Sequence, residues 1–301
     1  MASANSNLNK AKTVKNDEFY TQLIDIENEL MHYKAHFKDK IVLCNCDNPT
    51  WSAFWKYFHL NFAELGLKKL ISTHYDKTEP TYKMEYTGGD DNNIEVGIKT
   101  PLEGNGDFRN KECLDLLDEC DIVVTNPPFS LFREYVAQLI EHDKKFLIIG
   151  NKNAITYKEF FPLLKENKVW LGCTNVKEFL QPDGSIKKFG NIGWFTNLDI
   201  KKRHELLDLR GNYYDAEKYP TYDNYDAINV NKVNDIPCDY DGVMGVPISF
   251  LDKYNSEQFE IVGCTYNYGI PKDWSEDTNM QPIVNGKSVY KRILIRKKAG
   301  L

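Results

Sequence analysis

The pattern of apolar and polar positions predicts short buried strands separated by amphipathic helices. Several apolar runs have the length of strands and show little alternation, which is typical of strands buried on both faces of a sheet. We expect these strands at 40–47, 69–73, 122–125, 145–149 and 168–171. Between them, apolar residues recur at the three- and four-residue steps of helices. We expect helices at 17–37, 49–65, 111–119, 130–140 and 157–166.

This alternation predicts an α/β fold with a parallel sheet, helices on both faces and right-handed crossovers. Residues 76–100, with a Gly-Gly-Asp-Asp-Asn-Asn run, read as a hairpin or loop insertion. From about residue 204 the periodicity fades into segments rich in Tyr, Asn, Asp and Pro, followed by short mixed elements. We therefore expect a polar, disordered tail over residues 1–15, a main domain over 16–203 and a smaller α+β region over 204–301.

Capping residues predict several helix ends. Asn16 is placed to cap the first helix, whose apolar stripe starts at Phe19. Asn48 is placed to cap the second helix, which has Trp51 on its apolar face and Gly66 at its end. Ser130 is placed to cap the helix over 130–140.

The strand over 122–125 is followed by Asn126-Pro127-Pro128-Phe129. The prolines have no backbone N–H, so the strand ends in a rigid loop at its carboxyl end, where open α/β sheets bind ligands. Asn126 Oδ1 and the Pro127 carbonyl can each accept one hydrogen of an exocyclic amine, and Phe129 can stack on the ring that carries it. The alternative interpretation is a proline turn with Phe129 in the core.

Composition narrows the possible cellular location and the kinds of site that the protein can contain. The chain has 301 residues, a formal charge of −6 and an odd number of cysteines, seven, without regular spacing. We therefore expect a reducing, cytoplasmic location and no disulfide framework. No apolar run is long enough for a membrane span. Cys44 and Cys46 form a C-x-C pair without further ligands at matching spacing, so we predict no metal site.

The acidic total argues mildly against nucleic acid, yet a basic face can coexist with an acidic body. Local basic clusters occur at Lys144-Lys145, Lys187-Lys188, Lys201-Lys202-Arg203 and 291–298. They are either ordinary solvated surface or contacts for phosphates.

The loop at 126–129 is the Asn-Pro-Pro-Phe motif of amino-methyltransferases that act on adenine N6. With it, several segments make the chain resemble the EcoRI-type DNA adenine methyltransferases, from about residue 16 to the end. The segments are 17–22, 44–49, 106–109, 125–135 and 222–231. The resemblance implies a Rossmann-like methyltransferase sheet, transfer of a methyl group from S-adenosylmethionine (AdoMet) to adenine N6 by base flipping, and duplex DNA as partner. It leaves open a cognate restriction endonuclease acting on the same site.

The resemblance also implies cofactor-binding positions, with Asn126 shared between the cofactor and the target adenine. Around the methionine part of AdoMet it implies Phe19, Tyr20, Thr21, Cys44, Asn45, Cys46 and Asp47, although the loop at 44–49 lacks the usual glycines. Near the ribose and the adenine of AdoMet it implies Thr73, Tyr75, Asp107 and Phe108. Asp107 and Thr73 can equally serve as turn formers.

We assign recognition of the DNA base sequence to residues 204–301, where asparagine side chains would contact adenine and arginine side chains would contact guanine. The candidate DNA-binding residues are Lys201, Lys202, Arg203, Arg210, Asn224, Asn229 and Asn231. Loop polarity without base contact is the alternative interpretation for the last four. Two other functions stay open: methylation of RNA adenine or protein glutamine, and a DNA-binding regulator that has lost catalysis on the same scaffold.

Overall fold

A computed structural model describes residues 20–181, 184–265 and 281–299. The predicted tail over 1–15, the predicted cap Asn16 and the candidate Phe19 lie outside these residues. The described chain packs as two compact units, one holding 20–152 and 171–199, the other 153–170 and the residues from 200 onward. The domain boundary expected at 203 and 204 concerns function and stays a prediction, because the units are defined by packing alone.

The first unit is built on a mixed sheet. In the described residues the strand order is β1-β8-β9-β7-β6-β2-β3-β4-β5. Its centre is parallel and consists of β7 (Lys145–Asn151), β6 (Ile122–Thr125), β2 (Ile41–Cys44) and β3 (Lys69–Thr73). Every residue of β2 and β6 is buried, as the unalternating apolar runs predicted. The carboxyl ends of the four strands therefore meet at one edge.

Antiparallel strands extend this centre on both sides. The hairpin predicted within 76–100 is confirmed as β4 (Tyr82–Tyr86) and β5 (Ile98–Pro101), which continue the sheet from β3. On the other side β9 (Ile186–Thr196) pairs with β7. The sheet is thus mixed rather than wholly parallel, and the α/β class is confirmed.

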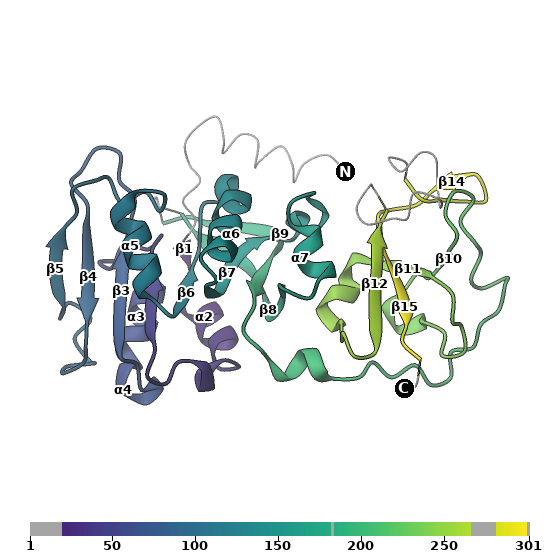
Figure 1. Cartoon of the computed structure of the whole chain (residues 1–301), viewed down its shortest axis with the longest axis horizontal. Coiled ribbons are helices and arrows are strands. Elements are labelled where there is room, and N and C mark those ends of the chain that lie inside the picture. Colours follow the sequence, from purple (N-terminus) through teal and green to yellow (C-terminus); the bar gives the residue numbers. More distant parts are fainter. Residues whose placement is uncertain (1–19, 182–183, 266–280, 300–301) are drawn as a thin grey trace. The chain divides into compact units, whose positions relative to one another are not determined.

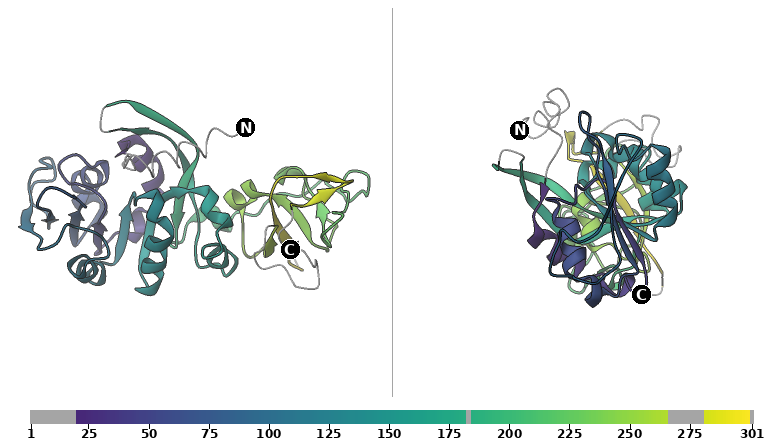
Figure 2. Two further views of the ribbon diagram at one scale, coloured as in Figure 1. Left: turned by 90° about the horizontal axis from the view of Figure 1, so that it is seen from above. Right: turned by 90° about the vertical axis from the view of Figure 1, so that its left-hand side faces the viewer.

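Helices lie on both faces of the sheet, as Figure 2 shows in its left view. One face carries α2 (Leu23–Leu30) and α3 (Ala53–Leu60), and the opposite face carries α5 (Lys111–Glu119) and α6 (Phe132–Glu141). The predicted bounds of α5 are confirmed. A short helix, α4 (Phe62–Leu65), ends at Gly66, which adopts the left-handed conformation with φ 64°. None of the helices described is long and apolar enough to cross a membrane.

Two predicted helix starts are wrong. The stripe expected to form a helix from residue 17 instead contains β1 (Tyr20–Thr21), and α2 starts only after Gln22. Tyr20 and Thr21 pair with the outer strand β8 (Trp170–Leu180), so sheet hydrogen bonds override the helical spacing. The cap of α3 is Ser52 and not Asn48.

Further along the chain, boundaries shift in the same way. Ser130 lies inside a 3₁₀ turn, η2 (Phe129–Leu131), and does not cap α6. The helix expected over 157–166 shortens to α7 (Phe161–Lys165), preceded by the 3₁₀ helix η3 (Lys152–Thr156). The strand expected at 168–171 grows into the eleven-residue β8, which forms a hairpin with β9 (Figure 1).

The second unit is dominated by short strands and irregular loops, as its low periodicity predicted. The described part contains a four-stranded sheet in the order β10-β11-β15-β12 and a two-stranded sheet of β13 and β14. Their bounds are β10 (Ile228–Asn229), β11 (Met244–Pro247), β12 (Phe259–Cys264), β13 (Ile283–Val284), β14 (Lys287–Ser288) and β15 (Arg292–Lys297). Short 3₁₀ helices connect them: η4 (Lys201–His204), η5 (Val233–Asp235) and η6 (Ile248–Lys253). An earlier 3₁₀ helix of the first unit is η1 (Lys34–His36).

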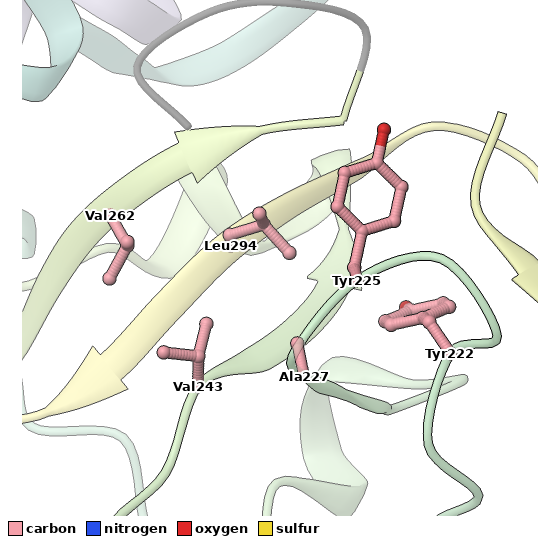
Figure 3. Packing of buried hydrophobic residues seen from close by; sticks show 6 residues of the cluster. All are labelled: Tyr222, Tyr225, Ala227, Val243, Val262 and Leu294. Atoms are coloured by element: carbon pink, nitrogen blue, oxygen red, sulfur yellow. The ribbon is translucent and has the colours of Figure 1, made fainter. Parts of the chain in front are cut away.

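The loop before β10 is fixed by a buried cluster (Figure 3). Its members are Tyr222, Tyr225, Ala227, Val243, Val262 and Leu294. The Tyr222 ring lies against the backbone of Gly245, where a Cβ atom would come within 2.2 Å of the Tyr222 hydroxyl oxygen. Tyrosines of an apparently polar loop therefore form part of the core of this unit.

Candidate functional site

A cavity of about 460 Å³ lies in the first unit, within the size range of small-molecule sites. Three loops at the carboxyl ends of parallel strands line it, at 45–48 after β2, 74–76 after β3 and 126–131 after β6. The remaining lining comes from β1, from the start of α3 with the turn before it, and from the loop at 106–109. The cavity therefore lies at the sheet edge where α/β proteins place their ligands.

The Asn126-Pro127-Pro128-Phe129 loop forms one wall of the cavity. β6 ends at Thr125, before the two prolines, and the 3₁₀ turn η2 then begins at Phe129. The Phe129 ring is half-buried and packs at nearly right angles to the rings of Phe179 and Phe189, with centroids 6.1 and 6.3 Å away. The four residues thus stand together at the cavity, with the aromatic ring braced by the hairpin of β8 and β9.

Asp47 is the buried acid behind this loop. Its carboxylate accepts hydrogen bonds from the hydroxyls of Thr125 and Ser52, the second at 3.0 Å, and from the backbone N–H of Asn126. Burial raises the pKa of Asp47 to about 6, while these three donors favour its charged form. Asp47 therefore joins the loop after β2, the start of α3 and the Asn126 loop through one charged group.

In the cavity wall, Thr21 Oγ1 and His74 Nδ1 are buried and have no hydrogen-bond partner among the described residues. Burial also lowers the pKa of His74, so its ring is neutral at pH 7. Such groups are costly to bury unless a ligand or water completes them. The cavity therefore has the polar lining that a small polar ligand requires.

Gly106 fits the loop at 106–109 closely against the turn after β3. It has φ 71°, and a Cβ atom there would lie 1.9 Å from the carbonyl oxygen of His74. Only glycine permits both the left-handed conformation and this approach. The contact brings Asp107 and Phe108 into the cavity wall.

Asp107, the candidate for contact with the cofactor adenine, is clamped by Arg109. Nε and Nη2 of Arg109 donate to its two oxygens at 2.8 and 2.6 Å, and the hydrogen bond holds the pKa of Asp107 below its ordinary value. Oδ1 also accepts from the backbone N–H of Arg109 at 3.0 Å, so the clamp orients the carboxylate and leaves acceptor capacity on Oδ2. The Phe108 ring packs edge-on against Tyr135, with centroids 5.0 Å apart.

The structure brings most of the predicted cofactor positions to the cavity. Those that line it are Tyr20, Thr21, Asn45, Cys46, Asp47, Tyr75, Asp107, Phe108 and Asn126. Cys44 and Thr73 are fully buried strand residues that do not line it. Thr73 Oγ1 donates to the carbonyl of Asn45 at 3.2 Å, so it supports the loop from behind.

Sequence reasoning missed several residues of the wall, among them Trp51, His74 and Arg109. Trp51, assigned to an apolar helix face, lies in the turn before α3, is 49% exposed and packs against Tyr20 in a tilted arrangement, with ring centroids 4.0 Å apart. His74 and Arg109 also line the cavity. The position of His74 directly after a parallel strand was the available signal for it, whereas nothing local signals the packing of Trp51 against Tyr20.

The candidate DNA-binding residues belong to the second unit, and several make hydrogen bonds within it. Asn229 is buried; its Oδ1 accepts from the Tyr222 hydroxyl at 2.9 Å and from Arg292 Nε at 3.3 Å. Its Nδ2 donates to Asn231 at 2.9 Å. Asn224 joins its loop to β13 by accepting from the N–H of Ile283. These contacts give the asparagines a structural role in the loop.

The basic candidates are placed differently. Arg210 is exposed and pairs bidentately with Asp208, at 2.9 and 2.7 Å. In η4, Lys201 is exposed and Lys202 half-buried, while the Arg203 guanidinium lies 3.5 Å from the centre of the Trp170 ring. Contact of any of these residues with DNA stays a prediction.

No group of three or more His, Cys, Asp or Glu side chains in the described part of the chain could hold a metal ion. All seven cysteines are described, and all are thiols.

Comparison with known proteins identifies the family of this chain. The family described as adenine-specific methyltransferase EcoRI matches residues 7–298. The chain belongs to this family, and the predicted activity of a DNA adenine methyltransferase is confirmed.

Three relatives carry the same general name. The chain is 49% identical to the type II methyltransferase M.EcoRI of Escherichia coli, over 98% of this chain and 97% of the relative. It is 41% identical to the type II methyltransferase M.MpnI of Mycoplasma pneumoniae, over 86% of each chain. It is 38% identical to the type II methyltransferase M.MgeORF184P of Mycoplasma genitalium, over 96% of this chain and 98% of the relative. No solved structure matches the chain.

Proposed function

We propose that this chain transfers the methyl group of AdoMet to N6 of an adenine within a specific site of duplex DNA. The observation that carries the proposal is the position of the Asn126–Phe129 loop. The loop can hold a planar amine, and it lines the same cavity as Thr21 and His74, whose buried polar atoms suit a polar cofactor. Amine and cofactor would thus meet in one enclosed space.

The lining residues fit AdoMet by their chemistry. Tyr20, Thr21 and Asp47 would hold the methionine part, and Tyr75, Asp107 and Phe108 the nucleoside part. Tyr20, packed against Trp51, would cover the cavity from the β1 side. When bound, AdoMet supplies the electrophilic methyl group. The sheet would accordingly be the Rossmann-like sheet of AdoMet-dependent methyltransferases.

The residues of the loop would act on the target amine. Asn126 Oδ1 and the Pro127 carbonyl accept its two hydrogens, which favours a pyramidal nitrogen with an available lone pair. Positive charge develops on that nitrogen during transfer, and acceptors that are already in place stabilise it. The N–H···carboxylate hydrogen bond from Asn126 to Asp47 would keep the peptide of this loop in position.

An adenine inside a duplex must be extruded before it can reach the cavity, at a cost of a few kcal/mol. Stacking on Phe129 would offset part of this cost, at about 1–3 kcal/mol per stacked base in comparable sites. Residues 16–203 would form the catalytic domain, and residues 204–301 would recognise the DNA sequence. The activity would be that of a restriction-modification methylase, with a cognate endonuclease acting on the same site.

The test is methyl transfer by the purified chain from labelled AdoMet. Unmethylated duplex DNA, RNA and a protein extract serve as parallel substrates, and the DNA is then sequenced for modified bases. We expect N6-methyladenine at one short DNA sequence. Label in RNA adenine or in protein glutamine would overturn the DNA assignment. DNA binding without AdoMet binding in calorimetry would instead identify an inactive regulator.

A further inference from the structure

The hairpin of β8 and β9 has two different faces beside the Asn126–Phe129 loop. Side chains alternate along a strand, so Lys187 and Phe189 of β9 share one face, and Ile186 and Lys188 share the other. Lys187 and Phe189 are half-buried, whereas Ile186 and Lys188 are exposed. We call the face of Lys187 and Phe189 the inner face of the hairpin.

Three rings connect this inner face to the catalytic loop. Phe129, Phe179 and Phe189 pack mutually edge-on, with centroids 5.6 to 6.3 Å apart and interplanar angles of 82° to 88°. Phe179 is fully buried and gives the cluster a fixed base, while Phe129 and Phe189 keep part of their surface open. The orientation of the Phe129 ring is therefore set by the hairpin as well as by its own loop.

The two neighbouring lysines of β9 are in different electrostatic surroundings. Lys188 Nζ pairs with Glu178 at 2.9 Å. Burial raises the pKa of Asp25, and the charge of Glu178 raises it further, so the surroundings of Lys188 are acidic. The ammonium of Lys187 lies on the inner face, 5.4 Å from the centre of the Phe189 ring, which contacts Phe129. A phosphate beside the Phe129 ring would therefore meet Lys187 and not Lys188, because the two side chains point to opposite faces of the hairpin.

We propose that the inner face of the hairpin is the DNA-side wall of the target-base site. Phe189 is a positioning residue that holds the Phe129 ring ready for the extruded adenine, and Lys187 binds a backbone phosphate beside that nucleotide. The inference rests on the proposed function. It places a DNA contact in the first unit, outside residues 204–301.

The lysine pair offers a matched test, because the two substitutions remove the same charge from adjacent residues of one strand. The probe is a duplex containing the site mapped by sequencing the methylated DNA, and binding is measured against salt concentration. We expect Lys187→Ala to reduce the slope of log K against log salt by about 0.9, the value of one phosphate contact. Lys188→Ala should retain the parent slope. Equal slopes for the two variants would overturn the role of Lys187.

Phe189 is tested by fluorescence of 2-aminopurine at the target position, which brightens when the base leaves the stack. We expect Phe189→Ala to lower the extruded population roughly two- to tenfold, the range that edge-on ring pairs are worth. Phe189→Tyr should restore it, and AdoMet affinity should match the parent in both variants. Unchanged fluorescence in a folded Phe189→Ala protein would overturn the positioning role. Absence of DNA methylation by the parent chain would be a failure of the proposed function instead.

Discussion

Two asparagines of this protein, Asn126 and Asn229, lie at similar places relative to a short strand and have different roles in the structure. Asn126 follows a buried strand, precedes two prolines and lines the cavity of the first unit. Asn229 lies in β10 of the second unit, buried between Tyr222 and Arg292. Both are polar residues at the end of a short strand. Only their partners distinguish a residue that faces a cavity from one that completes a core.

The difference shows how neighbouring residues decide the role of an asparagine. Around Asn126 the two prolines remove backbone donors, so the strand cannot continue past Thr125 and Asn126 stays in a loop at its end. Around Asn229 the side-chain oxygen already accepts two hydrogen bonds, which uses its full capacity. Reading a base with this oxygen would require breaking buried hydrogen bonds, at about 1–3 kcal/mol for each donor left unsatisfied.

The largest expected effect is that of Asn126→Ala. The substitution removes the side-chain oxygen that would accept a hydrogen bond from the reacting amine. By analogy with donors removed from oxyanion holes, the single-turnover transfer rate should fall about 100- to 1,000-fold. DNA and AdoMet affinities should stay near parent values, because the acceptor acts mainly on charge developing in the transition state. A rate loss matched by an equal loss of DNA affinity would place Asn126 in binding and not in transfer.

Phe129→Ala should have the next largest effect, through loss of about 1–3 kcal/mol of stacking on the extruded base. The rate defect should shrink when the target adenine faces a mismatch, because such a base costs less to extrude. Single-turnover rates on paired and mismatched duplexes, beside the melting temperature, provide the measurement. If Phe129 belonged only to the core, the substitution would instead cost about 3–5 kcal/mol of stability, with equal defects on both duplexes.

Asn229→Ala should lower stability and leave the transfer rate unchanged, the opposite of the effect expected for Asn126→Ala. It leaves the buried Arg292 Nε without this acceptor and the Tyr222 hydroxyl with only the Gly245 carbonyl at 3.2 Å, so we expect the second unit to lose about 1–3 kcal/mol of unfolding free energy. Denaturant unfolding measures this loss, and sequencing of methylated DNA measures the recognised site. A relaxed recognition site at parent stability would show that Asn229 reads a base after all.

The smallest effect concerns pH. Asp47 has a pKa raised by burial to about 6, and its charged form accepts hydrogen bonds from Asn126, Thr125 and Ser52. Protonation removes acceptor capacity, so the transfer rate should fall about tenfold between pH 7 and pH 5 as the ionised fraction falls. Asp47→Asn should remove this dependence. A parent rate that is flat over this range would separate Asp47 from the positioning of Asn126.

The raised pKa of Asp47 also makes the stability of the folded protein depend on pH. The folded state binds the Asp47 proton more tightly than the unfolded chain, whose ordinary value is 3.8. The contribution of this group to stability is therefore fully present below pH 3.8 and is lost as the pH rises through about 6. Activity and stability thus respond to Asp47 in opposite directions over that interval, which a pH series on the parent and on Asp47→Asn can separate.

The sequence by itself determined the features that depend on neighbouring residues. An unalternating apolar run followed by two prolines specifies both the strand over Ile122–Thr125 and its end, since proline cannot continue a ladder. The helix over Lys111–Glu119 follows from its own periodicity, and Gly66 ends α4 because it adopts positive φ without strain. The position of the Asn126–Phe129 tetrad at a strand end was therefore predictable.

Only the tertiary structure decided which local tendency prevails where distant segments meet. Tyr20 and Thr21 lie within the helix predicted over 17–37, yet pairing with β8 makes them a strand. The residues next to Asp47 in the sequence do not indicate that three hydrogen-bond donors surround its carboxylate. Tyr222 lies in a polar segment, and its burial depends on the space that Gly245 leaves for its ring. In each case the deciding energy comes from hydrogen bonds and burial between residues far apart in the sequence, which no local pattern records.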